Sequence, residues 1–443
     1  HLYMLGFAEN HLSVFSLTEK SSVPIVTLDT TPNVHAVYRF GKVVVEHLKT
    51  NELHHFRLKK QGETPLNETP TFKEYKTGKL QRVIRWKQLL VFFAPKEEST
   101  GQSIQPQYNY NQSIIRILDL TDPTAPKMHA LVELPYALPD TYSPDEAHSM
   151  QARQMYMPSN TTQASNTPKQ NWLRTSQGIV GLLWHYSSKE YKLLQVALDD
   201  PSSPKIQTLP LEKNTTIREL LPVSENRFYV VSDQKLRGEL HFQLQQWYLG
   251  KEQKWLSGFS VISKAPILHA YQKEQRTFFL AQKENDGLCL LEYDIQSGEL
   301  RERSQWSRSQ WRPKSLVRQG QQLQVLISPT DAKSTEKEQL VQFSLEKNTL
   351  SKKGSFDLGL SGLQLSGSHE GHIFLHLDAP KRKGQGLLFM KLSASLSVKG
   401  LHFLWTMDKV QHIEFSKDQA MVATGPSGIA QLDLQRSSIS SQP

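Results

Sequence analysis

The segment Ala420-Met421-Val422-Ala423-Thr424-Gly425-Pro426-Ser427-Gly428-Ile429-Ala430-Gln431-Leu432-Asp433-Leu434 decides the fold. It reads as an apolar strand, a tight Gly-Pro-Ser-Gly turn and a second strand that ends in Asp433. Gly and Pro supply the backbone angles of a short turn, and the flanking aliphatic residues suit a pleated sheet. Variants of this strand-turn-strand unit recur along the chain, so the sequence predicts a repeat protein.

Sets of four short strands return at regular intervals. The sets begin near Val34, Leu80, Trp172, Thr216, Ala265, Pro313, Leu363 and Val410. The spacing is roughly 44 to 50 residues, except for about 92 residues after Leu80. Period-2 alternation dominates, and helical periodicity is scarce. Four-stranded units of this length are typical of a β-propeller, because blades packed in a ring bury the faces that a single blade would expose. We therefore predict an all-β fold: a β-propeller of four-stranded antiparallel blades, forming one domain over residues 1–443.

The number of blades depends on how the ring closes. The last set, from Val410, has three strands before the chain becomes rich in Ser. An N-terminal strand, most simply Ile25–Leu28, fills its fourth place. We expect eight blades, closed by N- and C-terminal strands, with seven blades as the alternative. The hairpin of Leu2–Leu17 is then surplus: it caps the ring, adds to an edge, or replaces strands assigned to the C-terminus.

The long interval after Leu80 indicates insertions and not a hidden blade. Residues 95–111 are rich in Gln and Ser, and we expect them to be mobile. Residues 135–170 are rich in Pro, Ser, Asn and Gln and show no alternation. We assign both insertions to one elaborated blade, a place where a rigid scaffold carries its contacts. The insertion residues that we expect to contact a partner are Tyr142, His148, Met155 and Tyr156.

The composition limits the possible partners and compartments. The formal net charge of +9 predicts attraction to anionic surfaces, although the basic residues are dispersed along the chain. The chain has no run of about 18 apolar residues, so we expect no membrane-spanning helix. The single cysteine, Cys289, lies in a predicted strand and is expected to be a buried, inert thiol.

Two segments share a finer pattern. In Ile117–Lys127 and Val196–Lys205, a strand with Asp at its end runs into Asp-Pro-(Thr/Ser)-x-Pro-Lys. Asp accepts hydrogen bonds from amides two residues further on and Pro presets φ, so we place here the turn between the third and fourth strands. These residues resemble the LVIVD-type repeat of bacterial and archaeal secreted or surface β-propellers. The unit Ala423–Asp433 resembles the preceding half of that repeat. The resemblance implies an extracytoplasmic location, in the periplasm or on the cell surface, and it carries no catalytic residues.

Motifs for catalysis or cofactor binding are absent from the sequence. We find no nucleophile elbow, Walker loop, dinucleotide fingerprint or Cys/His zinc spacing. His372 and His376 are four residues apart on a predicted strand, about 13 Å, which is too far for one metal ion. We therefore expect no metal, no cofactor and no assigned catalytic residue. Side chains of several blades can still converge at the axis. A rim of His, Asp and Arg there would favour an enzyme, and an apolar rim a scaffold.

Aromatic and basic residues are interleaved at one predicted junction between two blades, in the segment Trp306-Ser307-Arg308-Ser309-Gln310-Trp311-Arg312. Stacking combined with positive charge suits a sugar or another anionic ligand, whereas Trp at this place also suits packing between blades. We include Trp306, Arg308, Trp311 and Arg312 among the predicted partner-binding residues.

The sequence favours a non-catalytic role: a protein-protein scaffold or accessory subunit of an envelope or cell-surface assembly. The alternative is a propeller hydrolase or lyase, or a lectin-like binder, acting on an anionic polysaccharide. We do not expect nucleic acid to be the partner.

Overall fold

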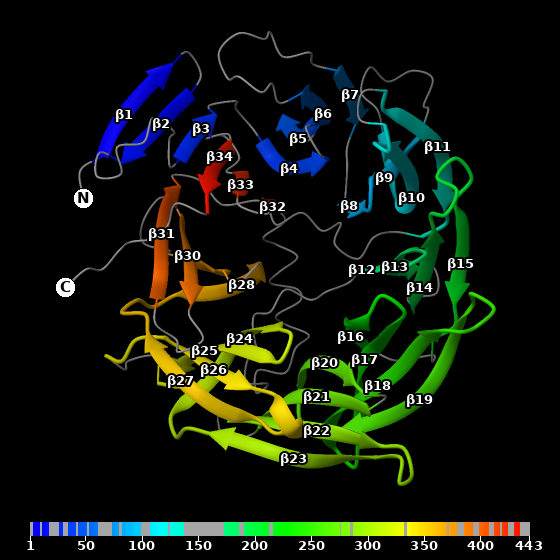
Figure 1. Ribbon diagram of the computed structural model, residues 1–443. Helices are drawn as coiled ribbons and strands as arrows, with labels where there is room; N and C mark the ends of the chain where they lie inside the picture. Colours follow the sequence, from blue (N-terminus) through cyan, green and yellow to red (C-terminus); the bar gives the residue numbers. More distant parts are fainter. Residues whose placement is uncertain are drawn as a thin grey trace.

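The computed structural model describes residues 3–8, 11–16, 26–29, 34–40, 43–50, 53–60, 73–78, 82–98, 107–122, 125–136, 172–185, 190–211, 216–274, 276–283, 287–331, 335–369, 372–378, 385–392, 398–406, 412–416, 419–423 and 429–434. Within these residues, seven four-stranded sheets and one six-stranded sheet form the blades of a ring (Figure 1). All strand pairings are antiparallel between neighbours in each sheet, and the helical structure described is one 3₁₀ turn, η1 (Glu346–Asn348). The predicted all-β propeller is confirmed.

Each blade runs from an innermost strand near the axis to an outer strand at the rim (Figure 1). Blade 1 is β4 (Val34–Phe40), β5 (Val43–Thr50), β6 (Leu53–Lys60) and β7 (Lys73–Gly78). Blade 2 is β8 (Arg82–Trp86), β9 (Leu89–Glu98), β10 (Gln107–Asp119) and β11 (Lys127–Leu134). Blade 3 is β12 (Trp172–Thr175), β13 (Gly178–His185), β14 (Glu190–Ala197) and β15 (Lys205–Leu209). Blade 4 is β16 (Thr216–Ser224), β17 (Arg227–Leu236), β18 (Glu239–Leu249) and β19 (Trp255–Ser263).

The remaining blades follow the same order, and the last one uses both ends of the chain. Blade 5 is β20 (Ile267–Lys273), β21 (Arg276–Lys283), β22 (Gly287–Asp294) and β23 (Glu299–Ser307). Blade 6 is β24 (Trp311–Gln319), β25 (Gln322–Pro329), β26 (Gln339–Ser344) and β27 (Ser351–Asp357). Blade 7 is β28 (Leu363–His369), β29 (His372–Asp378), β30 (Gln385–Leu392) and β31 (Val398–Thr406). Blade 8 is β32 (His412–Ser416), β33 (Gln419–Ala423), β34 (Ile429–Asp433), β3 (Val26–Asp29), β2 (His11–Ser16) and β1 (Tyr3–Ala8).

An N-terminal strand closes the ring. Strand β3 pairs with β34, with Val26 opposite Leu432 and Asp29 opposite Ile429. The hairpin of β1 and β2 then continues the sheet outward from β3. Eight blades and closure by the two ends of the chain are therefore confirmed. Of the three places considered for the N-terminal hairpin, the structure selects the edge of blade 8.

Burial falls from the second strand of a blade to its outer strand. In β21 and β25, five consecutive residues are buried, because these strands have a neighbouring blade on each face. In the outer strands β23 and β27, every residue is exposed or half-buried, because one face of the strand meets water. This gradient explains why the second strands are continuous apolar runs in the sequence and these outer strands are mostly polar.

Contacts between neighbouring blades hold the ring together. Aromatic pairs fill the spaces between them, such as Phe56 of blade 1 with Phe92 of blade 2, whose ring centroids are 4.3 Å apart. Blades 6 and 7 are joined by a buried carboxylate, Glu338. Its Oε1 lies 2.8 Å from Lys314 Nζ, and its Oε2 accepts a hydrogen bond from the Leu363 amide at 2.7 Å.

The turns between third and fourth strands have the predicted chemistry. Asp119 Oδ1 accepts a hydrogen bond from the Thr121 amide at 2.8 Å, and Asp200 Oδ1 accepts one from the Ser202 amide at 3.0 Å. Strands β11 and β15 begin directly after Pro126 and Pro204, as expected for edge strands. The role of these Asp residues as turn formers is thereby confirmed.

At one end of blade 2, as in blades 3 and 4, the two middle strands pair beyond the ends of the two flanking strands. Ser113 of β10 pairs with both Pro95 of β9 and Leu134, the last residue of β11. Beyond this level β9 and β10 continue as a two-stranded ribbon that reaches the pair Glu98–Gln107. The flanks of the predicted insertion 95–111 are thus strands, because both arms keep pairing past the end of the four-stranded sheet. The second insertion, 135–170, leaves β11 at the same level and belongs to the connection from blade 2 to blade 3; residues 137–170 lie outside the described residues.

Candidate functional site

The first two strands pair in the same register in every blade. In each blade, the last residue of the innermost strand pairs with the residue three positions later, as Phe40 does with Val43 and Trp86 with Leu89. The penultimate residues of the eight innermost strands therefore occupy equivalent places around the axis: Arg39, Arg85, Arg174, Val223, Gln272, Arg318, Ser368 and Phe415. Four of these residues are arginines, and three of the four belong to the consecutive blades 1, 2 and 3. We call Arg39, Arg85, Arg174 and Arg318 the axial arginines.

The axial arginines for which contacts are resolved reach toward preceding blades. Arg39 Nη1 donates to Gln419 Oε1 of blade 8 at 3.0 Å. The guanidinium of Arg85 lies over the Phe40 ring of blade 1, 4.4 Å from its centroid, and forms an ion pair with Glu414 of blade 8. Arg85 therefore spans blade 1 to connect blades 2 and 8.

Two titratable groups of β32 lie among these cations. Burial raises the pKa of Glu414 above its ordinary value, and the charge of Arg85 opposes this rise. Burial, aided by the charge of Arg174, lowers the pKa of His412 to about 4, so this imidazole is neutral at pH 7. The ring of His412 lies 4.9 Å from that of Tyr38. Among the described residues, the axial ends of blades 8, 1, 2 and 3 thus carry polar and cationic side chains, and Arg85 and Glu414 form an ion pair there.

Arg318 forms a second polar group between blades 5 and 6. Its guanidinium lies 4.1 Å from the centroid of the Tyr271 ring. The Arg318 Nε and Tyr271 hydroxyl are buried and have no hydrogen-bond partner among the described residues. Burial raises the pKa of Tyr271 to about 12 and, together with the charge of Arg318, lowers the pKa of His269 to about 4. Neither neighbour of Arg318 therefore carries a compensating negative charge at pH 7.

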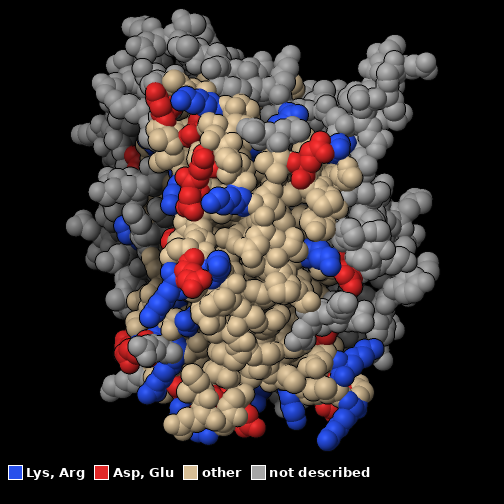
Figure 2. Space-filling model, turned by 90° about the vertical axis from the view of Figure 1, so that its right-hand side faces the viewer, with Lys and Arg blue, Asp and Glu red and all other residues tan. Residues whose placement is uncertain are grey.

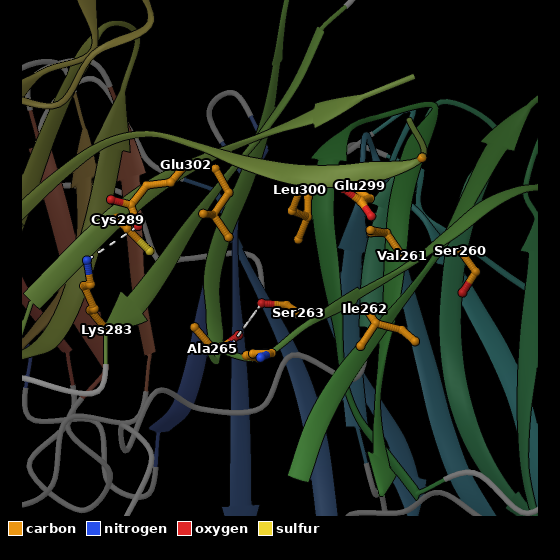
Figure 3. A pocket seen from close by; sticks show the side chains of 13 residues that line it. Ser260, Val261, Ile262, Ser263, Ala265, Lys283, Cys289, Glu299, Leu300 and Glu302 are labelled. Carbon is orange, nitrogen blue, oxygen red and sulfur yellow. Dashed lines mark hydrogen bonds and ion pairs between the residues drawn. The ribbon is translucent and has the colours of Figure 1, made fainter. Parts of the chain in front are cut away.

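A groove of about 820 Å³ lies at the rim between blades 4 and 5. Its walls come from β19, β22 and β23, with Val261 and Cys289 buried in its floor and Ile262 43% exposed at its edge (Figure 3). Lys283 and Glu302 form an ion pair across it, with Nζ and Oε2 3.5 Å apart. The groove combines an apolar floor with charges of both signs.

The thiol in this groove is unsuited to nucleophilic chemistry. Cys289 is 4% exposed, and its Sγ lies 3.7 Å from the Ala281 carbonyl oxygen. Burial, aided by the charge of Glu302, raises the pKa of Cys289 to about 11, so the thiolate is scarce at pH 7. The burial of this cysteine, expected from the sequence, is confirmed, and its low reactivity stays a prediction.

The segment 306–312 links β23 of blade 5 to β24 of blade 6. Trp311 is 3% exposed and packs in the apolar core between these blades, and Trp306 meets Phe343 edge to face at 5.2 Å. Arg308 lies over the Trp311 ring at 4.1 Å and donates to Gln339 Oε1 at 2.6 Å, whereas Arg312 is exposed. The packing role considered for Trp holds for Trp311, which leaves the two arginines as the accessible part. Ligand binding by this segment stays a prediction.

The other predicted partner-binding residues, Tyr142, His148, Met155 and Tyr156, lie outside the described residues. Within the described part of the chain, no three His, Cys, Asp or Glu side chains are arranged to hold a metal ion. The same part contains no helix with the length and hydropathy needed to cross a membrane. On the face shown in Figure 2, acidic and basic side chains are interspersed, in keeping with the dispersed charge of the sequence.

The fold and topology define an eight-bladed β-propeller. No family model and no curated protein matches the chain. Among solved structures, Saccharomyces cerevisiae Sqt1 aligns with 90% of this chain and 95% of its own, at 8% identity and a TM-score of 0.45. The C-terminal WD40 domain of Sif2 aligns with 90% and 95%, at 10% identity and a TM-score of 0.43. A protein from Lactobacillus plantarum aligns with 79% and 92%, at 10% identity and a TM-score of 0.40. The fold assignment rests on the strand topology and not on these likenesses.

The axial arginines were not predicted, although the sequence holds a signal for them. The fragments Tyr38-Arg39-Phe40, Ile84-Arg85-Trp86, Leu173-Arg174-Thr175 and Val317-Arg318-Gln319 each place an arginine one residue before the end of an innermost strand. Aligning the repeats on the strand end would have exposed this recurrence, which the spacing of whole blades does not reveal.

Proposed function

We propose that this β-propeller is a non-catalytic scaffold or accessory subunit of an envelope or cell-surface assembly, and that it holds a protein partner at the extended end of blade 2. The observation that carries the proposal is the two-stranded ribbon of β9 and β10 beyond the pair Pro95–Ser113. Both β8 and β11 stop short of the ribbon, so its two outer edges have no described strand beside them.

A two-stranded ribbon is marginally stable alone in water. The backbone N–H and C=O groups along its edges can pair with a strand of another chain. A partner that pairs with an edge of the ribbon would satisfy these backbone groups and add a strand to the blade. Strand β11 ends at Leu134, opposite Ser113 where the ribbon begins, and the predicted insertion 135–170 follows it in the sequence, which supports a contact surface at this end of blade 2. The extracytoplasmic location comes from the LVIVD-like turns alone and is part of this proposal.

The test uses a variant in which residues 97–108 are replaced by Asn-Gly. Lys96 and Asn109 are paired, so a two-residue turn can join them without disturbing the blade. The matched control replaces the turn Arg237-Gly238 of blade 4, between the paired Leu236 and Glu239, by the same Asn-Gly. A third variant lacks residues 137–170.

Wild type and variants are cross-linked in cells, purified from envelope and soluble fractions, and their partners quantified by mass spectrometry. We expect a partner in the envelope fraction that is retained by the control and lost when the ribbon is shortened. Equal recovery of every partner by the control and by both blade 2 variants would contradict the proposal. Recovery of the protein from the soluble cytosolic fraction alone would contradict the location.

The axial arginines favour a second candidate function, a binder or an enzyme acting on an anionic ligand. Cationic and His side chains converge at the axis, which is the arrangement that we associated with ligand chemistry and not with a purely apolar ring. Turnover of an acidic polysaccharide by the purified protein would support the enzyme over the scaffold.

A further inference from the structure

An arginine and a tyrosine from neighbouring innermost strands are in direct contact between blades 5 and 6. Tyr271 lies on β20 and Arg318 on β24, the two strands of these blades that border the axis (Figure 1). The Arg318 guanidinium lies over the Tyr271 ring, 4.1 Å from its centroid. The Tyr271 ring stacks on Phe278 at 5.2 Å, within the apolar core that the two blades share. The guanidinium therefore rests on an aromatic ring that the core holds in place.

This pair contains two buried polar atoms without a partner. The Tyr271 hydroxyl and the Arg318 Nε are buried and form no hydrogen bond among the described residues. Tyr271 as a whole is 1% exposed. Buried donors in proteins almost always have an acceptor, because an unpaired one loses its hydration without compensation. Two donors from adjacent blades are thus in place for an acceptor that the described part of the chain does not supply.

The charge of Arg318 also has no carboxylate partner within the described residues. Burial lowers the pKa of Arg318, and the opposing influence comes from Tyr271. The carboxylate of Glu292, whose charge acts on Tyr271, is paired with Arg303 and, at 3.5 Å, with Arg276. A half-buried guanidinium stays protonated at neutral pH and is costly to keep without an anion. An anionic acceptor is therefore favoured over a neutral one.

We propose that Arg318 and Tyr271 bind the carboxylate group of a small organic acid that enters from the axis. One carboxylate oxygen accepts hydrogen bonds from the guanidinium, and the other accepts one from the Tyr271 hydroxyl. Arg318 is half-buried and is held by the Tyr271 ring and not by hydrogen bonds, so its side chain can shift to admit the acid. The acid is small, because both donors are enclosed between two blades.

The surrounding groups favour a monoanion. Burial raises the pKa of Tyr271 to about 12, so its hydroxyl keeps the proton that it donates. His269, whose ring centroid lies 6.5 Å from that of Tyr271, has its pKa lowered to about 4 by burial and is neutral at pH 7. The site thus offers the single positive charge of Arg318. A carboxylate matches this charge, whereas a doubly charged phosphate would keep one negative charge uncompensated in a half-buried place.

The test measures binding to the full chain by ligand-observed NMR, with acetate and benzoate as probes, acetamide and benzamide as their neutral counterparts, and inorganic phosphate as the divalent anion. We expect saturable binding of a carboxylate, and weaker binding of its amide and of phosphate. Arg318→Gln should weaken carboxylate binding about tenfold or more, because it removes a charge-assisted hydrogen bond. Arg318→Lys keeps the charge but not the planar pair of donors and should give an intermediate loss. Tyr271→Phe should weaken binding several-fold.

A matched control separates this site from general attraction by net charge. Arg237→Gln makes the same change of charge at an exposed turn of blade 4 and should alter the affinity less than about twofold. Thermal unfolding shows whether each variant is folded. Tyr271→Phe loses no hydrogen bond to the described residues, so its midpoint without probe should not fall below that of wild type. A saturating carboxylate should raise the midpoint of wild type and of Arg237→Gln, but not that of Arg318→Gln.

The absence of carboxylate binding at millimolar probe would overturn the proposal. Equal weakening by Arg318→Gln and Arg237→Gln would do so as well, and amides that bind as tightly as their acids would show that the site does not recognise charge. Phosphate binding more tightly than both acids would overturn the assignment to a carboxylate, and an affinity unchanged by Tyr271→Phe would remove the hydroxyl from the site. The proposal goes beyond the scaffold role, which depends on the ribbon of blade 2 and is unaffected by these outcomes.

Discussion

Arg85 and Glu414 form an ion pair although 329 residues separate them in the chain and blade 1 stands between their own blades. The side chains are 24% and 14% exposed, so the pair is largely removed from water. The bond ties blade 2 to blade 8, next to the place where β3 closes the ring. The Arg85–Glu414 ion pair therefore belongs both to the blade that closes the ring and to the polar side chains near the axis.

The pair predicts how stability depends on pH. Burial raises the pKa of Glu414 in the folded state, so its contribution to stability is largest below the pKa of the unfolded chain and is lost as pH rises through the folded pKa. Glu414→Gln cannot ionise, and we expect its stability relative to wild type to improve as pH rises from about 4.5 to 7. Urea unfolding over this range measures the difference in the free energy of unfolding between the two proteins, and a constant difference would refute the prediction.

Arg85→Ala should lower the free energy of unfolding by roughly 2 kcal/mol at pH 7, because it leaves the Glu414 carboxylate without its partner.

Glu338 is predicted to be the critical joint between blades 6 and 7. Replacing Glu338 by Ala removes an ion pair with Lys314 and leaves the Leu363 amide without its acceptor. We expect a loss of about 2–4 kcal/mol in the free energy of unfolding. Glu252→Ala is the control. The Glu252 side chain is 81% exposed and pairs with Lys254 at 3.4 Å, so its removal should cost less than about 0.5 kcal/mol. Similar losses for the two variants would contradict this account.

Ring closure predicts unequal effects of two N-terminal truncations. Removing residues 1–18 deletes β1 and β2 but keeps β3 paired with β34. Removing residues 1–31 also deletes β3 and uncovers the edge of β34. We expect the shorter truncation to unfold cooperatively near the wild-type midpoint, and the longer one to lose cooperativity or aggregate. Urea unfolding and gel filtration compare them; equal behaviour would show that β3 does not close the ring.

Trp311 and Arg312 are adjacent but should differ in what their replacement changes. Trp311→Ala empties a buried site between blades 5 and 6 and should cost about 3–5 kcal/mol of stability. Arg312→Gln should leave stability within about 0.5 kcal/mol and lower the salt concentration at which the protein leaves an anionic polysaccharide resin. An unchanged elution point would remove Arg312 from the predicted binding surface.

Cys289 should react with thiol reagents only after unfolding. Its burial and raised pKa keep both access and the thiolate fraction low in the folded state. A chromogenic disulfide reagent added to native and urea-unfolded protein gives the two rates. Comparable rates would show that the groove between blades 4 and 5 opens readily.

The sequence alone determined the architecture, because its evidence is local. Alternation, Gly-Pro turns and the Asp119 and Asp200 turn residues report how each strand and turn meets its immediate surroundings, and a fixed repeat length makes those signals add up. The missing fourth strand of the last set likewise identified residues 25–28 as the closing strand, which β3 confirms.

Only the tertiary structure decided what lies at the axis and at the ends of the blades. The convergence of Arg39, Arg85 and Arg174 is a property of ring closure, which brings equivalent positions of separate repeats to one level. The burial of Trp311 depends on the neighbouring blade, and the ribbon beyond Pro95 depends on pairing between arms whose composition suggests a mobile loop. Contacts between blades join residues tens to hundreds of positions apart. The residue pattern within one strand therefore cannot predict which residues of another blade it contacts.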